Sequence, residues 1–188
     1  GSYLDPKGKE GLAGLTGALM ARGGIPSSPA DELDEELEFL AARLSSKFGG
    51  LSGSVSLNLL SKDADRGFEI LRAVLAAPSF QEDKLALRKT QALQGLKQRN
   101  DNSSSIESRE RNFLAYGDDF WFNRHTTAAS LESISREDLL EFHHEWVHPR
   151  NFIVSVSGDF DRDAMLKRLD GGFAAWPHSG QKTPPVPQ

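Results

Sequence analysis

Three histidines are the side chains best suited to bind a metal ion, and they lie near the end of a predicted helix: His143, His144 and His148. His144 and His148 are four residues apart, so they would share one helix face. Pro149 follows directly, where a helix ends or frays, and no third ligand is evident. Because zinc in a hydrolase takes three protein ligands, we expect an exposed or capping role for these histidines.

A run of carboxylates between positions 31 and 38 could also hold a cation. Ser28 and Pro29 precede it, and they are typical of a helix cap and of a first helical position. Negative charge at a helix N-terminus is favoured by the helix dipole. We therefore expect a helix over 29–46 with a solvated acidic face. The acidic residues of that face are Asp31, Glu32, Asp34, Glu35, Glu36 and Glu38.

Polar and apolar residues alternate over 52–61, which predicts a strand with two different faces. Val55, Leu57 and Leu59 make one face apolar. The opposite face carries three small polar side chains: Ser54, Ser56 and Asn58. This polar face could line a hydrated cavity or lie at the protein surface, and the alternation fits both.

The most aromatic loop of the chain spans 118–125 and contains Phe120, Trp121 and Phe122. These rings could form an exposed binding surface. They could equally anchor the loop to the core, and the sequence leaves both interpretations open.

Two glycines interrupt a short helix that is predicted over 11–23. Its apolar residues recur at helical spacing: Leu12, Leu15, Leu19 and Met20. Gly14 and Gly17 each cost this helix about 0.5–1 kcal/mol relative to Ala. We therefore expect a neighbouring helix or strand to approach the helix closely at these positions.

Other elements follow from the same periodicities. Helices are expected at 63–77, 82–99, 106–116 and 161–169, with one more beginning after Ser135 as its N-cap. A second strand is expected at 152–157, where apolar and smaller residues alternate again.

The composition excludes several classes of function. The chain has 188 residues, a net charge of -5 and no cysteine. The acidic balance argues against nucleic-acid or anionic-membrane partners, because these are bound by clustered Lys and Arg. No apolar run is long enough to span a bilayer. Without cysteine there is no disulfide framework or thiolate nucleophile, and localisation is left open.

The segment before the first helix reads Asp5-Pro-Lys-Gly-Lys-Glu-Gly-Leu-Ala13. A Pro-x-Phe joint at 78–80 and a Pro-x-Asn turn at 149–151 follow it in order. This arrangement resembles the insulinase-like zinc peptidases of the M16 family, which includes the mitochondrial processing peptidases. The resemblance covers about residues 2–176 and implies an α+β fold, mainly an antiparallel sheet covered by helices.

Active members of that family carry an inverted zinc motif, His-x-x-Glu-His, directly after the Gly-Leu-Ala. In this chain the matching positions are Gly14, Gly17 and Ala18. The family's third ligand, a Glu, matches about Gly95, beside Gln94. Gly and Ala cannot ligate zinc or act as the general base, and neither Gly95 nor Gln94 offers a carboxylate. The resemblance thus implies no catalytic residue and no metal ligand here, although zinc is the cofactor of active members.

Silent units in this family pair with zinc-bearing ones and help hold an extended peptide by β-addition. The resemblance implies such a partner, in the same polypeptide or another chain, or a homodimer, with peptide as substrate. The strand that matches 52–61 lies near the family's substrate groove, which makes its polar face a candidate peptide site. The candidate residues are Ser54, Ser56 and Asn58.

Two alternatives remain. The chain could be a purely structural subunit, like the core proteins of respiratory complex III, or an active zinc metallopeptidase that uses its histidine cluster. In either case the M16-like domain is expected to span 1–176, without the opening strands that usually precede its first helix. Residues 177–188 are Pro-rich and are interpreted as a linker or tail.

Overall fold

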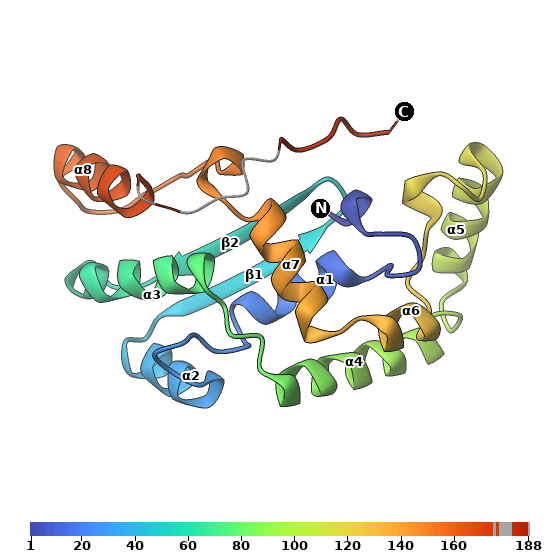
Figure 1. Cartoon of the computed structure of the whole chain (residues 1–188), viewed down its shortest axis with the longest axis horizontal. Helices are drawn as coiled ribbons and strands as arrows, with labels where there is room; N and C mark the ends of the chain where they lie inside the picture. The colour runs from blue at the N-terminus through green and yellow to red at the C-terminus, as the bar shows by residue number, and fades with distance from the viewer. Residues whose placement is uncertain (175, 177–181, 188) are drawn as a thin grey trace.

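A β-hairpin backed by one short helix is the centre of the fold (Figure 1). The computed structural model describes residues 1–174, 176 and 182–187. Within them the strands are β1 (Arg43–Gly49) and β2 (Ser52–Asn58). The α-helices are α1 (Leu12–Met20), α2 (Ala30–Phe39), α3 (Ala64–Ala76), α4 (Glu82–Lys97), α5 (Ser103–Tyr116), α6 (Ala128–Ser133), α7 (Arg136–Trp146) and α8 (Arg162–Phe173). Short 3-10 turns are η1 (Ser2–Leu4), η2 (Ser61–Asp63), η3 (Trp121–Asn123) and η4 (Pro149–Asn151).

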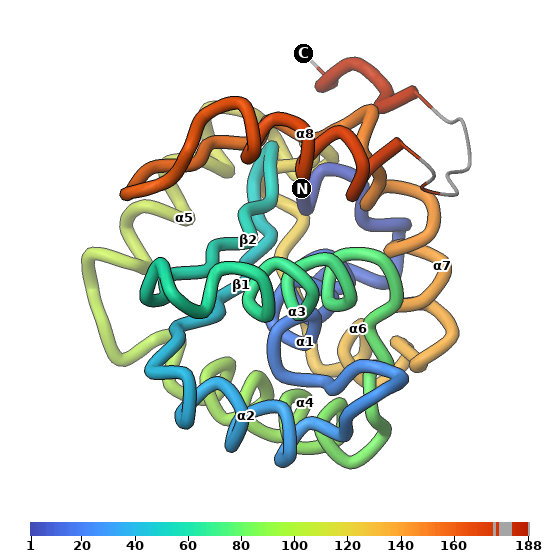
Figure 2. Tube along the Cα trace, turned by 90° about the vertical axis from the view of Figure 1, so that its left-hand side faces the viewer, coloured from blue at the N-terminus to red at the C-terminus, as the bar shows by residue number. Residues whose placement is uncertain are grey.

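The hairpin, α1 and α7 form successive layers, as the side view in Figure 2 shows. The two strands are antiparallel, with Leu44 opposite Leu57 on the face toward α1. The apolar residues predicted to line α1 are buried, together with side chains from α2, α3 and α7. The predicted α+β class is therefore confirmed. None of the described helices is both long and apolar enough to cross a membrane.

The start of α1 is fixed by the side chain of Asp5, which is 5% exposed. Its two carboxylate oxygens accept hydrogen bonds from the backbone N–H groups of Gly11 (2.9 Å) and Ala13 (2.8 Å). Burial raises the pKa of this carboxyl above its usual range. Lys9 in the same loop pairs with Asp138 of α7. These contacts hold the loop and α1 in one place relative to α7.

The helix predicted over 29–46 is wrong in its second half, because α2 ends at Phe39 and β1 begins at Arg43. Ala41 takes a positive φ of 49°, which turns the chain out of the helix. Leu44, which lies in the range predicted as helix, is buried as a residue of the strand β1. The predicted N-cap is also displaced, since the N-cap is Pro29 and its side chain makes no capping bond.

The second strand predicted at 152–157 does not form within the described residues. Residues 153–157 make no backbone hydrogen bond with any described residue, and Ile153 is fully exposed. Alternation of apolar and polar residues predicts which side chains share a face. A strand also requires backbone hydrogen bonds to a neighbouring strand, and the alternation does not predict these. Among the described residues this segment pairs with no strand, and the described sheet has two strands.

The remaining helices lie close to their predicted ranges. Ser135 caps α7, as predicted, and it also forms a capping box with Asp138. Asp161 caps α8 through the backbone N–H of Ala164. Of the predicted linker, residues 177–181 and 188 lie outside the described part. Pro184 lies against η1, where its carbonyl accepts a hydrogen bond from the Tyr3 hydroxyl at 3.3 Å.

Candidate functional site

The three positions that match the family's zinc motif lie on α1, and they differ in their surroundings. Gly17 is buried against β1, and an added Cβ would overlap the backbone nitrogen of Phe48 and lie 2.9 Å from its Cβ. Gly14 is exposed and has nothing within 4 Å of an added Cβ. The close approach that we expected at both glycines therefore occurs only at Gly17. No residue larger than glycine fits there while β1 stays in place.

A serine bond fixes this contact between helix and strand. The Ser46 hydroxyl of β1 donates a hydrogen bond to the carbonyl oxygen of Gly17. The Oγ atom of Ser46 also accepts a hydrogen bond from the backbone N–H of Ala21 at 3.0 Å. The hydroxyl thus bridges two turns of α1. The packed helix and strand leave no space for a general base at position 17.

The remaining zinc position also has no donor atom. Gly95 and its neighbour Gln94 lie exposed on α4, and an added Cβ at Gly95 would meet nothing within 4 Å. Zinc needs nitrogen, oxygen or sulfur ligands, so the residues at these positions do not fit the metal. Across the described residues, no group of three or more His, Cys, Asp or Glu side chains could hold a metal ion.

The histidine cluster is mostly buried, which corrects the exposed or capping role expected for it. His143 is 7% exposed and its Nε2 lies 2.8 Å from the carbonyl oxygen of Leu75. Burial lowers the pKa of His143, although that hydrogen bond acts in the opposite direction. His148 is also buried, and its Nε2 lies 3.2 Å from the side-chain nitrogen of Asn151. Only His144 is exposed.

The side of the hairpin that faces away from α1, hereafter the outer sheet face, is exposed along both strands. Its residues are Arg43, Ser45, Lys47, Ser54, Ser56 and Asn58. The register places Ser45 opposite Ser56, and their hydroxyl oxygens are 2.9 Å apart. The three residues predicted on β2 therefore do share one accessible face. That they bind peptide stays a prediction.

The sequence analysis missed the β1 half of this face, because it assigned 43–46 to a helix. A signal was available in Gly49-Gly50, which is typical of a hairpin turn between two alternating segments. A strand before that turn places Arg43 and Lys47 on the same face as the predicted serines.

The aromatic loop is anchored to the rest of the chain, as the second interpretation has it. Asn123 is buried and donates to the carbonyls of Asn112 (3.0 Å) and Gly117 (2.7 Å). The Trp121 ring packs edge to face on Tyr3 at 6.0 Å. These contacts are those of a structural loop.

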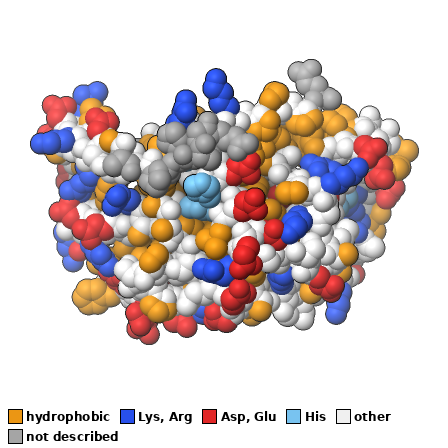
Figure 3. All heavy atoms as spheres, in the orientation of Figure 1, with side chains coloured by type: hydrophobic (Ala, Val, Ile, Leu, Met, Phe, Trp, Pro, Cys, Tyr) orange, Lys and Arg blue, Asp and Glu red, His pale blue; other side chains and the backbone are white. Residues whose placement is uncertain are grey.

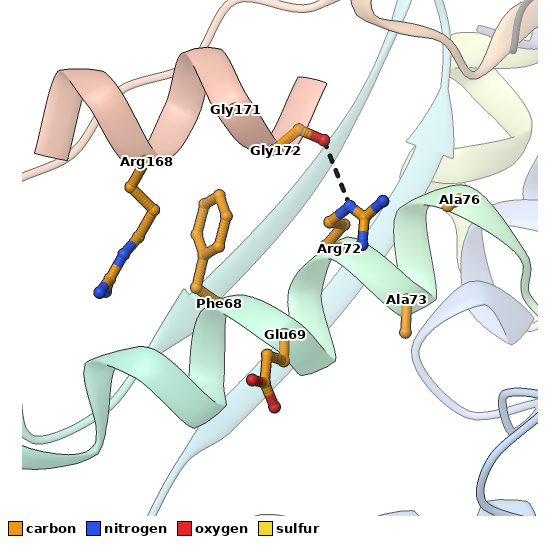
Figure 4. Close-up of a pocket in the computed structure, with 8 residues that line it drawn as sticks. All are labelled: Phe68, Glu69, Arg72, Ala73, Ala76, Arg168, Gly171 and Gly172. Carbon is orange, nitrogen blue, oxygen red and sulfur yellow. Dashed lines mark hydrogen bonds between the residues drawn. The ribbon is translucent and has the colours of Figure 1, made fainter. Parts of the chain in front are cut away.

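A groove of about 470 Å³ lies between α3 and α8 (Figure 4). Phe68 points from α3 toward α8, and Arg168 lies 6.0 Å from its ring. Both arginines here have partners, since Arg168 pairs with Asp65 and Arg72 donates to the carbonyl of Gly172 at 3.2 Å. We interpret the groove as the packing seam of α8.

The fold and the positions on α1 together resemble an α+β unit of the M16 peptidase type in which the positions matching the zinc motif are Gly14, Gly17 and Ala18. Residues 133–188 match the family model described as "Peptidase M16 inactive domain". This confirms the resemblance to the M16 family that the sequence indicated.

Solved structures share the fold over the whole chain. The M16 inactive domain from Pseudomonas fluorescens matches with a TM-score of 0.88 at 24% identity, and the chain covers 46% of it. The periplasmic protease PqqL from Escherichia coli matches with a TM-score of 0.81 at 16% identity, and the chain covers 22% of it. Both matches cover 100% of this chain.

A curated relative is an uncharacterized zinc protease of Rickettsia bellii (strain RML369-C). It is 21% identical over 177 residues, which are 93% of this chain and 42% of that protein. The chain thus spans less than half the length of the proteins that it matches.

Proposed function

We propose that this chain is a catalytically silent M16 unit that pairs with a zinc-bearing M16 unit and helps to hold its peptide substrate. The observation that carries the proposal is the contact between Gly17 and Phe48. The frame of an active-site helix is intact and well anchored, yet a strand backbone fills the space of its general base.

This contact bears on catalysis for a chemical reason. A zinc peptidase needs protein ligands for the metal and a carboxylate that takes the proton of the metal-bound water. The positions on α1 and α4 supply neither. A silent unit that keeps its fold is useful to a peptidase through its surfaces, and the outer sheet face is one that the fold leaves free.

The outer sheet face suits an extended peptide because the hairpin has an unpaired edge. Among the described strands β1 pairs only with β2, so its other edge is open to main-chain hydrogen bonds. A peptide added there would place alternate side chains beside those of the outer sheet face.

The test uses the purified chain after tag removal. Elemental analysis and a quenched peptide library should show neither bound zinc nor cleavage for the chain alone. Mixed with a zinc-bearing M16 unit of the same organism, the chain should form a complex and bind labelled peptides. Chelator-sensitive cleavage by the chain alone would contradict the silent assignment.

A variant pair separates peptide holding from a purely structural role. Ser54→Tyr places a large ring on the outer sheet face and should weaken peptide binding by the complex. Ser104→Tyr makes the same change at an exposed position of α5 and should leave binding unchanged. A complex that forms but binds peptide equally well in both variants would favour the purely structural subunit.

A further inference from the structure

Two cations on the outer sheet face have no polar partner among the residues that the structure describes. Arg43 and Lys47 are exposed on β1, and neither forms an ion pair or a side-chain hydrogen bond with any described residue. Neither strand of the hairpin contains an aspartate or a glutamate. The face is therefore positive, although the chain as a whole has a charge of -5.

The helix-covered side of the molecule has a more mixed surface. On the helix-covered side, Figure 3 shows Lys and Arg side chains intermingled with Asp and Glu. Several cations outside the hairpin are paired, as Arg66 is with Glu36 and Lys84 with Asp31. An unpaired cationic face on an acidic protein has its charge available for a ligand.

The spacing of the two cations is that of alternate positions in a strand. Arg43 and Lys47 are four residues apart, so they lie on one face about 13 Å from each other. An extended peptide beside β1 presents its own residues with the same repeat. Carboxylates four residues apart in the peptide would each meet one cation, whereas carboxylates three apart would point to opposite faces.

The hydroxyls between the cations add no competing charge. Ser45 and Ser56 bond to each other and lie between the levels of the two cations. The only formal charges on the outer sheet face are thus those of Arg43 and Lys47.

We propose that the outer sheet face selects acidic extended peptides, with carboxylates four residues apart that pair with Arg43 and Lys47. This inference rests on the proposed function, since it names the class of peptide that the face holds. Nucleic acid is disfavoured because phosphate-backbone binding uses many more cations than two, and the chain is acidic overall.

The test measures binding of short fluorescein-labelled peptides with blocked ends, by anisotropy, to the complex with the zinc-bearing unit. The peptides share one Thr- and Val-rich sequence and differ at two positions. Four peptides are compared. One carries two Glu four residues apart, one carries two Glu three residues apart, one carries two Gln, and one carries two Lys. We expect the four-apart Glu peptide to bind most tightly, with an advantage over the Gln peptide that shrinks as salt is raised.

Variants connect the preference to the two residues. Arg43→Gln/Lys47→Gln should weaken binding of the four-apart Glu peptide about fivefold and leave the Gln peptide unchanged. The control Arg150→Gln/Lys97→Gln removes one Arg and one Lys that are exposed and unpaired elsewhere among the described residues. It should leave the preference intact.

Each alternative outcome has a separate meaning. Equal binding of the Glu, Gln and Lys peptides would overturn the charge inference and keep peptide holding. Failure of every peptide to bind would overturn the peptide-holding function itself. If the control variant also lost the preference for the Glu peptide, net charge would be its cause, which would overturn the role of Arg43 and Lys47. Tighter binding of a single-stranded oligonucleotide than of the Glu peptide would overturn the choice of peptide as ligand.

Discussion

The two faces of the β1–β2 hairpin differ in what determines their residues. On the inner face Leu44 is buried, Ser46 bonds to α1, and Phe48 lies against Gly17. On the outer face Arg43 and Lys47 form no ion pair or side-chain hydrogen bond with a described residue. The inner residues are fixed by packing, whereas these two outer side chains are not held by polar contacts among the described residues. A binding role for the hairpin is therefore best sought on its outer face.

The two glycines of α1 provide the same contrast within one helix. They match two positions of one catalytic motif, yet only Gly17 is required by a neighbouring strand. Gly14 lies in open space and costs helix stability without a packing reason.

The largest expected effect tests that contrast. Gly17→Ala should lower the free energy of unfolding by about 3 kcal/mol, because its Cβ would force β1 away from α1. Gly14→Ala, the matched control, should raise it by about 0.5–1 kcal/mol. Urea denaturation of both variants measures the difference. Equal effects would show that α1 does not contact β1 as described.

The cap of α1 comes next. Asp5→Ala should lower the free energy of unfolding by about 2 kcal/mol, because the N–H groups of Gly11 and Ala13 lose their acceptor. Asp159→Ala changes an exposed aspartate outside the helices and should have little effect. The same denaturation assay measures both variants. If Asp5→Ala lowered the free energy of unfolding by less than about 0.5 kcal/mol, the scale of a neutral surface substitution, water would be replacing the carboxylate as acceptor.

Adjacent serines sharpen the comparison of the two sheet faces. Ser46→Ala should cost about 1.5 kcal/mol, because its hydroxyl bridges Gly17 and Ala21. Ser45 lies on the outer sheet face, so Ser45→Ala should lower the free energy of unfolding by less than about 0.5 kcal/mol. Thermal unfolding of the two variants side by side gives the measurement, and a larger loss for Ser45→Ala would reverse the assignment of the faces.

The smallest effect is a pH dependence from His143. Burial lowers its folded-state pKa, so the unfolded chain takes up the proton first as the pH falls. The stability present above about pH 6.5 is lost as the pH drops toward the folded-state pKa. His143→Gln should remove up to about 1 kcal/mol of the difference between neutral and mildly acidic pH.

Denaturation of wild type and His143→Gln at both pH values tests this. Gln can still donate to the Leu75 carbonyl, so the variant changes titration with little change in packing. His144→Gln, at the exposed neighbour, should keep most of the wild-type dependence. An unchanged pH dependence in His143→Gln would assign it to other groups, such as His125, whose pKa burial also lowers.

The sequence predicted α1 and the caps of α7 and α8 because these features depend on nearby residues. Glycine and proline residues end helices, and the side chains of capping residues hydrogen-bond to the backbone at a helix start. The prediction failed at β1 because Leu40, Ala41 and Leu44 fit helical spacing, while the turn that ends α2 depends on a positive φ at Ala41. It failed at 152–157 because strand pairing is not encoded in one segment.

The candidate site was half predictable for the same reasons. Alternation placed Ser54, Ser56 and Asn58 on one face, and the structure agrees. Arg43 and Lys47 became visible only with the hairpin register. That Gly17 and not Gly14 contacts a strand could not be read from either residue alone.

The unpaired segment 153–157 has a consequence for handling the protein. Ile153 is fully exposed, and Val154 and Val156 are 49% and 42% exposed, beside backbone groups without hydrogen-bond partners among the described residues. An exposed extended segment of this kind is a template for edge-to-edge association. The isolated chain should therefore aggregate as its concentration rises, and a lysine at position 153 is the substitution expected to keep it in solution.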